Sequence, residues 1–66
     1  MFKKMKAKIL QLQAELQANK GIVPDSWKPY LELIKLLLVI SELFEDADTR
    51  VIIQEIIAAI TLAESA

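Results

Sequence analysis

The middle of the chain, residues 29–45, has the pattern of a helix that is apolar around most of its circumference. At roughly 100° per residue, three of its charged side chains and that of the preceding Lys28 fall within one arc about 80° wide, together with Val39. A helix with so wide an apolar surface needs neighbours on most of its sides. A chain of 66 residues has little else with which to cover it. The charged arc comprises Lys28, Glu32, Lys35 and Glu42.

The short length of the chain limits how its fold can be stabilised. We expect one small domain over residues 1–66, and a domain of this size buries only about 60% of the surface that its unfolded chain exposes. Disulfides, a metal ion or oligomerisation commonly stabilise such domains. The chain contains no Cys and no His, which removes disulfides and the common zinc ligand sets. We therefore expect it to complete its core by oligomerisation or against a larger protein.

Apolar periodicity predicts an all-α fold, a three-helix hairpin-type bundle with helices at about residues 2–19, 29–45 and 49–64. The first helix has the 3-4-3-4 spacing of a coiled-coil seam, which is narrow and needs one main neighbour. Its seam residues are Phe2, Met5, Ile9, Leu12 and Leu16.

The third helix has two apolar surfaces. Its β-branched segment 51–53 is also compatible with a strand, but apolar residues recur at i, i+3, i+4 and i+7, which favours a helix. A smaller strip containing Val51, Ala58 and Leu62 lies opposite the main stripe. The main stripe comprises Ile52, Ile53, Ile56, Ile57, Ala59, Ile60 and Ala63.

The first connection contains signals for a helix end and for a small apolar cluster. Gly21 suits the left-handed residue that follows a helix, and Ile22 would then fold back onto Leu16. Two aromatic residues follow before the second helix. They are candidates for interface anchors, but we favour their covering one end of the core. The residues of this predicted core cap are Ile22, Val23, Trp27 and Tyr30.

The boundaries of the later helices follow from Pro and Asp. Lys28 precedes a proline and is disfavoured in the α region, so Pro29 is the expected first residue of the second helix. Asp46 or Asp48 is the expected N-cap of the third helix, because a short acidic side chain accepts a hydrogen bond from the first turn.

The apolar surface of the second and third helices predicts where other chains bind. In a lone three-helix bundle each helix has a solvent face of roughly 120° or more. The second and third helices carry apolar residues on the part of their surface that would face solvent. The alternative is a tight monomer in which long Lys and Glu side chains cover the leucines. Candidate interaction residues are Leu31, Leu36, Leu38, Leu43, Val51 and Leu62.

Charge is distributed unevenly along the chain. Residues 1–20 have a net charge of +4, and residues 21–66 have a net charge of −5. The basic end suits an anionic membrane surface, whereas the absence of interleaved Arg and aromatic residues and the pI near 5.3 argue against nucleic acid. We favour a solvated helix face, or one that meets acidic residues of a neighbour. The candidate basic surface comprises Lys3, Lys4, Lys6 and Lys8.

No residue pattern indicates catalysis, a metal site or a cofactor. Without His or Cys, a nucleophile would have to be Ser or Thr, and none of these is placed beside a suitable base. Residues 30–44 are apolar but interrupted by charges and too short for a transmembrane helix. Residues 1–16 lack the unbroken apolar run of a signal peptide. We expect a soluble protein, cytoplasmic or part of a larger assembly.

The sequence thus predicts a non-enzymatic structural, assembly or adaptor module. It would act through helix–helix self-association or by docking on a larger protein, for instance as an accessory subunit of a virion or another complex. The alternative is a small protein that binds a membrane surface or another anion through its lysine-rich N-terminal helix.

Overall fold

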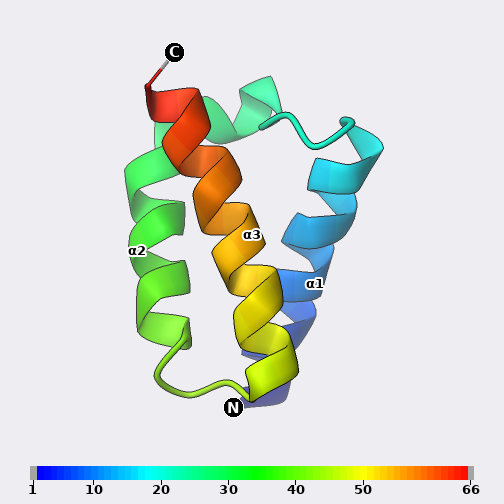
Figure 1. Ribbon diagram of the computed structural model, residues 1–66, viewed down its shortest axis with the longest axis vertical. Helices are drawn as coiled ribbons and strands as arrows, with labels where there is room; N and C mark the ends of the chain where they lie inside the picture. Colours follow the sequence, from blue (N-terminus) through cyan, green and yellow to red (C-terminus); the bar gives the residue numbers. More distant parts are fainter. Residues whose placement is uncertain (1, 66) are drawn as a thin grey trace.

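The computed structural model describes residues 2–65, with side chains from Lys3 onward. This part of the chain forms three α-helices and one short 3₁₀ helix, and it contains no strand, which confirms the all-α prediction. The helices are α1 (Phe2–Ala18), the 3₁₀ helix η1 (Asp25–Tyr30), α2 (Leu31–Ser41) and α3 (Ala47–Glu64) (Figure 1).

The third helix, α3, lies between the other two. α1 and α2 each pack along α3, and no comparable packing joins α1 to α2 in the part of the chain that is described. α1 and α3 run in the same direction, and α2 runs against them (Figure 1). A helix in this position needs a surface that is apolar toward both neighbours. Ile53, Ile56 and Ile60 supply it, each with 0% of its surface exposed.

The stripes predicted for α1 and α3 form most of the core. Every third or fourth residue of these helices points toward the shared centre, as the periodicity indicates. The side chain of the seam residue Phe2 lies outside the described part of the structure. The buried core comprises Ile9, Leu16, Val23, Trp27, Leu38, Ile53, Ile56 and Ile60. Half-buried residues around it are Met5, Leu12, Leu31, Ile34, Ile52, Ile57, Ala59 and Ala63.

Helix α1 ends in a left-handed turn. The N–H of Gly21 donates to the carbonyl oxygen of Leu16 at 2.8 Å, the bond that closes a Schellman motif. Gly21 has φ +79°, as predicted, and Lys20 also lies in the left-handed region with φ +59°. The prediction for Ile22 is wrong, since this residue is 68% exposed. The turn directs the next residue, Val23, into the core instead.

The predicted core cap forms only in part. Val23 and Trp27 are buried, whereas Ile22 and Tyr30 are exposed. Trp27 lies in η1, whose tighter turn begins where the N–H of Trp27 donates to the carbonyl oxygen of Pro24 at 3.0 Å. This turn carries one large aromatic side chain inward and leaves the other at the surface.

The second helix is shorter than predicted at both ends. Pro29 belongs to η1, so α2 begins at Leu31 and not at the proline. α2 ends at Ser41 rather than at residue 45, because the N–H groups of Leu43 and Phe44 donate to carbonyl oxygens three residues back instead of four. The hydroxyl of Ser41 donates to the carbonyl oxygen of Leu37 at 2.7 Å. The backbone bonds of Leu43 and Phe44 form the turn that leads from α2 to α3.

Helix α3 begins at Ala47, two residues before the predicted start. Its N-cap is Asp46, one of the two predicted residues, whose Oδ1 accepts a hydrogen bond from the N–H of Thr49 at 2.9 Å. Residues 51–53 are helical, which confirms helix rather than strand in that segment. Thr49 is 1% exposed and anchors the first turn against the core.

Candidate functional site

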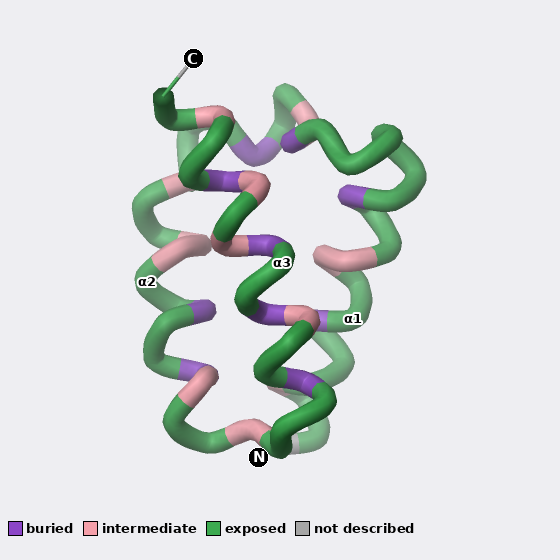
Figure 2. Tube along the Cα trace, in the orientation of Figure 1, coloured by how far each residue is buried: buried purple, intermediate pink, exposed green. Residues whose placement is uncertain are grey.

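The solvent side of α2 is apolar. Leu33, Leu36 and Leu37 are each 57% exposed, and Ile40 is 43% exposed. Leu38, in contrast, is 2% exposed and faces α3. Leu36 and Ile40 lie two residues before and after Leu38, which places them on the opposite side of the helix. Exposed residues, coloured green, recur along the whole length of α2 (Figure 2). This helix therefore presents leucine and isoleucine to water on the face that is usually polar.

The charged arc of α2 forms a contact with α3. The Nζ of Lys35 donates to Oε1 of Glu64 at 3.0 Å, with both side chains two-thirds or more buried. A hydrogen bond with the Glu64 carboxyl, and its negative charge, raise the pKa of Glu32 above its ordinary value. The pKa of Glu64 is lowered below its ordinary value, mainly by the same hydrogen bond with Glu32 and secondly by the hydrogen bond with Lys35. The charges thus connect two helices and leave the opposite side of α2 uncovered.

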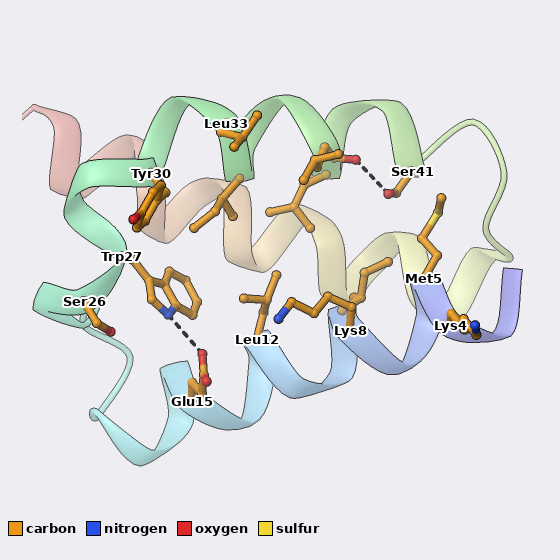
Figure 3. Close-up of a pocket in the computed structure, with 14 residues that line it drawn as sticks. Lys4, Met5, Lys8, Leu12, Glu15, Ser26, Trp27, Tyr30, Leu33 and Ser41 are labelled. Carbon is orange, nitrogen blue, oxygen red and sulfur yellow. Dashed lines mark hydrogen bonds between the residues drawn. The ribbon is translucent and has the colours of Figure 1, made fainter. Parts of the chain in front are cut away.

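An apolar groove of about 900 Å³ lies between α1 and α2. It exists because α1 and α2 pack on α3 and not on each other. Its most buried lining residues are Ile9 of α1 and Leu38 of α2. Side chains from both helices and from η1 line it (Figure 3). The lining also includes Met5, Leu12, Trp27, Tyr30, Leu33, Ile34, Leu37 and Ser41.

The two ends of the groove differ in polarity. At one end, Trp27 reaches across from η1 and its Nε1–H donates to Oε2 of Glu15 on α1 at 3.0 Å (Figure 3). At the other end, where Ser41 of α2 lies, Lys4 lies on the α1 side, and the side chain of Lys8 extends from α1 toward Leu12 in the middle of the groove (Figure 3). The α1 wall is thus acidic at one end and basic at the other.

The predicted basic surface is divided by the fold. Lys4 and Lys8 line the groove and have no ion pair with the described residues. Lys6 points elsewhere and lies 3.5 Å from a carboxylate oxygen of Asp46, the N-cap of α3. Lys3 is exposed and is not part of the groove. Two of the four lysines therefore lie where an occupant of the groove would meet them.

The predicted interaction residues occupy three different environments. Leu38 is in the core, which corrects its assignment to an interaction surface, and Leu31 is half-buried against the same core. Leu36 lies on the exposed face of α2. The remaining three are exposed elsewhere, and Leu43 and Val51 share a small depression of about 360 Å³ at the α2–α3 turn. Leu62 is 71% exposed near the end of α3.

Sequence reasoning missed the groove residues of α2. Leu33 and Leu37 line the groove and are not among the predicted interaction residues. Tyr30, the last residue of η1, also lines it, although the sequence favours this residue as part of the core cap rather than as an interface anchor. Tyr30, Leu33 and Leu37 are spaced three and four residues apart, as on one side of a coiled-coil seam, and this spacing is the sequence signal for a shared surface. Because α2 is apolar on almost every side, several such spacings coexist in it and the sequence does not distinguish among them.

The described residues show neither a metal-binding cluster nor a membrane-spanning helix. Within residues 2–65, no group of three or more Asp or Glu side chains is arranged to hold a metal ion. No helix in this range combines the length and apolar character needed to cross a bilayer. Comparisons of the chain with protein-family models, with curated proteins and with solved structures give no match.

Proposed function

We propose that this protein is a non-enzymatic assembly or adaptor module that acts by helix–helix association through α2 and the adjoining groove. One observation carries the proposal: the side of α2 that faces water is made of leucine and isoleucine, next to an apolar groove of about 900 Å³. Contiguous exposed apolar surface of this kind marks sites of protein association. A partner that covers it gains the free energy of removing that surface from water.

The shape of the groove suits a helix. α1, α3 and α2 take three of the four positions of a four-helix bundle, and the groove takes the fourth. The α2 wall is 11 residues long, which corresponds to a helix of about three turns and ~16 Å. Amphipathic helices bind such grooves through apolar residues spaced three and four apart.

The membrane-surface alternative draws less support from the fold. An amphipathic helix binds a bilayer by inserting its apolar face among the acyl chains. The apolar face of α1, which includes Ile9 and Leu16, is packed in the core of the bundle. Binding through this face would require α1 to leave α3.

Site-specific photo-crosslinking in the cells that produce the protein tests the proposal. A photoreactive amino acid at Leu37, on the groove wall, is expected to give a defined protein adduct, either with the protein itself or with a larger protein. The same amino acid at Leu62, which is exposed on α3 and away from the groove, is the matched control. Equal labelling at both positions, or no adduct at Leu37, would exclude association through this surface.

A further inference from the structure

We infer that the groove is filled by α2 of a second copy of this chain, in a reciprocal dimer whose two-fold axis runs parallel to the helices. Each copy would place its α2 in the fourth bundle position of the other. This inference rests on the proposed function and names the partner.

The apolar surface of α2 favours a second copy over an unrelated helix. A foreign helix in the groove would cover Leu33 and Leu37, which line it. Leu36 and Ile40 lie outside the groove lining and would stay exposed. A reciprocal exchange covers both sets, because the helix that fills one groove is itself covered by the groove of the other copy. One contact therefore removes both of these exposed apolar surfaces from water.

The exchange also accounts for the position of the charges. In the dimer α2 contacts three helices: α3 of its own chain, α2 of the second copy and α1 of the second copy. One side stays open to water, the side away from the groove. Glu32 and Val39 lie there, next to the Lys35–Glu64 ion pair. The one side of α2 that carries charge is thus the side that the dimer leaves uncovered.

The two-fold axis sets the pairing along α2. Because parallel helices related by such an axis meet residue by residue, Tyr30, Leu33 and Leu37 would each lie against the same residue of the second copy, in a 3-4 seam. Leu36 and Ile40 would face α1 of the second copy. None of these five residues is charged, so the α2 helices of the two copies meet without charge repulsion.

Charges on the α1 wall agree with this direction. α2 runs opposite to α1 (Figure 1), so the parallel α2 of the second copy would also run opposite to α1. Its C-terminal end would lie at the end of the groove where Lys4 is, and its N-terminal end beside Glu15 (Figure 3). A helix C-terminus carries a partial negative charge and an N-terminus a partial positive charge. Each end of the second α2 therefore meets a side chain of opposite sign.

The first test measures mass by light scattering during size-exclusion chromatography over micromolar concentrations. The parent protein is expected at twice its 7.5 kDa chain mass. Leu36→Glu is expected to halve that mass and to retain the helical circular-dichroism spectrum, because Leu36 is exposed in the single chain. Leu62→Glu, the matched control, is expected to leave the dimer intact. A parent mass of 7.5 kDa, or dimers in both variants, would overturn the inference.

The second test determines the direction of pairing. The chain contains no Cys, so one introduced cysteine reports one position. Under oxidation Leu33→Cys is expected to form a disulfide-linked dimer, since its Cα would lie within the roughly 4.4–6.8 Å from its counterpart that a disulfide requires. Leu62→Cys is expected to stay monomeric on a denaturing gel. A dimer in solution without the Leu33→Cys bridge would exclude the parallel exchange.

The two proposals fail in different ways. A monomeric parent that still gives an adduct with a larger protein at Leu37 would refute the second copy as occupant and keep the assembly function. A monomeric parent with no adduct at Leu37 would refute both.

Discussion

Helices α2 and α3 are both rich in leucine or isoleucine, yet they use these residues in opposite ways. In α3 the large residues Ile53, Ile56 and Ile60 are completely buried. In α2 only Leu38 is buried to a similar degree, and Leu36 is 57% exposed. The difference arises from position, since α3 packs along two α-helices, whereas α2 packs along one α-helix and contacts the short η1. Apolar content alone therefore does not distinguish a helix whose large apolar residues are buried from one that exposes them to water.

Truncating an isoleucine in each helix gives the largest expected contrast. Ile56→Ala removes a fully buried side chain and is expected to lower the free energy of unfolding by about 2–5 kcal/mol. Ile40→Ala removes one that is 43% exposed, and in dilute protein it is expected to change that free energy by only about 0.5 kcal/mol. Urea unfolding followed by circular dichroism measures both.

Protein concentration sharpens this first comparison. At higher concentration Ile40→Ala is expected to lose stability relative to the parent, because a dimer is stabilised by mass action. Ile56→Ala is expected to lose nearly the same free energy of unfolding in dilute and in concentrated protein, because Ile56 is buried within the single chain. Equal losses for the two variants in dilute protein would show that α2 is as well covered as α3 and would remove the contrast.

The same contrast explains what the sequence predicts and what it does not. The stripes of α1 and α3 are confirmed nearly residue by residue, because in each helix one apolar stripe is clearly larger than any other and therefore points inward. Helix α2 is apolar on most sides, so its sequence does not show which side points inward. The sequence analysis therefore places Leu38 on the same surface as Leu36. These two residues have the same chemistry and lie two positions apart, yet one is buried and the other exposed.

Contacts between distant segments were also beyond prediction. The pairing of Lys35 with Glu64 joins residues 29 positions apart, and no local pattern indicates it. The groove likewise depends on α1 and α2 lying on separate sides of α3. The N-cap Asp46 was predictable because its bond to Thr49 lies within one turn of the chain.

The two helices also begin differently, and a cap substitution tests the consequence. The N-cap side chain of α3, Asp46, accepts a hydrogen bond from Thr49, whereas the N-cap of α2, Tyr30, makes no such bond. Asp46→Ala is expected to lower the melting temperature, by less than Ile56→Ala does, because the first turn of α3 loses its acceptor. Asp48→Ala is the matched control with little expected effect, and equal effects would contradict the capping role.

Acid titration gives a second measurement for Asp46. Its hydrogen bonds with Thr49 hold its pKa below the ordinary value of 3.8. A carboxylate with a lowered folded-state pKa contributes stability that is complete above the unfolded value and is lost as the pH falls through the folded one. The parent is therefore expected to lose stability below about pH 4. Asp46→Asn keeps an acceptor without a titrating proton, so it should lose less over that range.

The smallest expected effect is at the contact that holds the charged arc of α2 on α3. Glu32 has a raised pKa because of its hydrogen bond with Glu64 and the charge of that carboxylate. A raised carboxyl pKa contributes stability that is complete below the unfolded value and is lost as the pH rises through the folded one. Glu32→Gln keeps a hydrogen-bond donor toward Glu64 and removes the repulsion. Its melting temperature relative to the parent should therefore rise slightly as the pH increases from 4 to 7.

Glu55→Gln is the control for this last comparison, because Glu55 is an exposed carboxylate of α3 outside the contact with α2. It is expected to show no rise relative to the parent over the same pH range. A rise in both variants would reflect the change in net charge and not the Glu32–Glu64 contact. A rise in Glu32→Gln alone, with the dimer mass unchanged, would show that this side of α2 stabilises the single chain without contributing to association. The charged and apolar sides of α2 would then have separable roles, one toward α3 and the other toward the second copy.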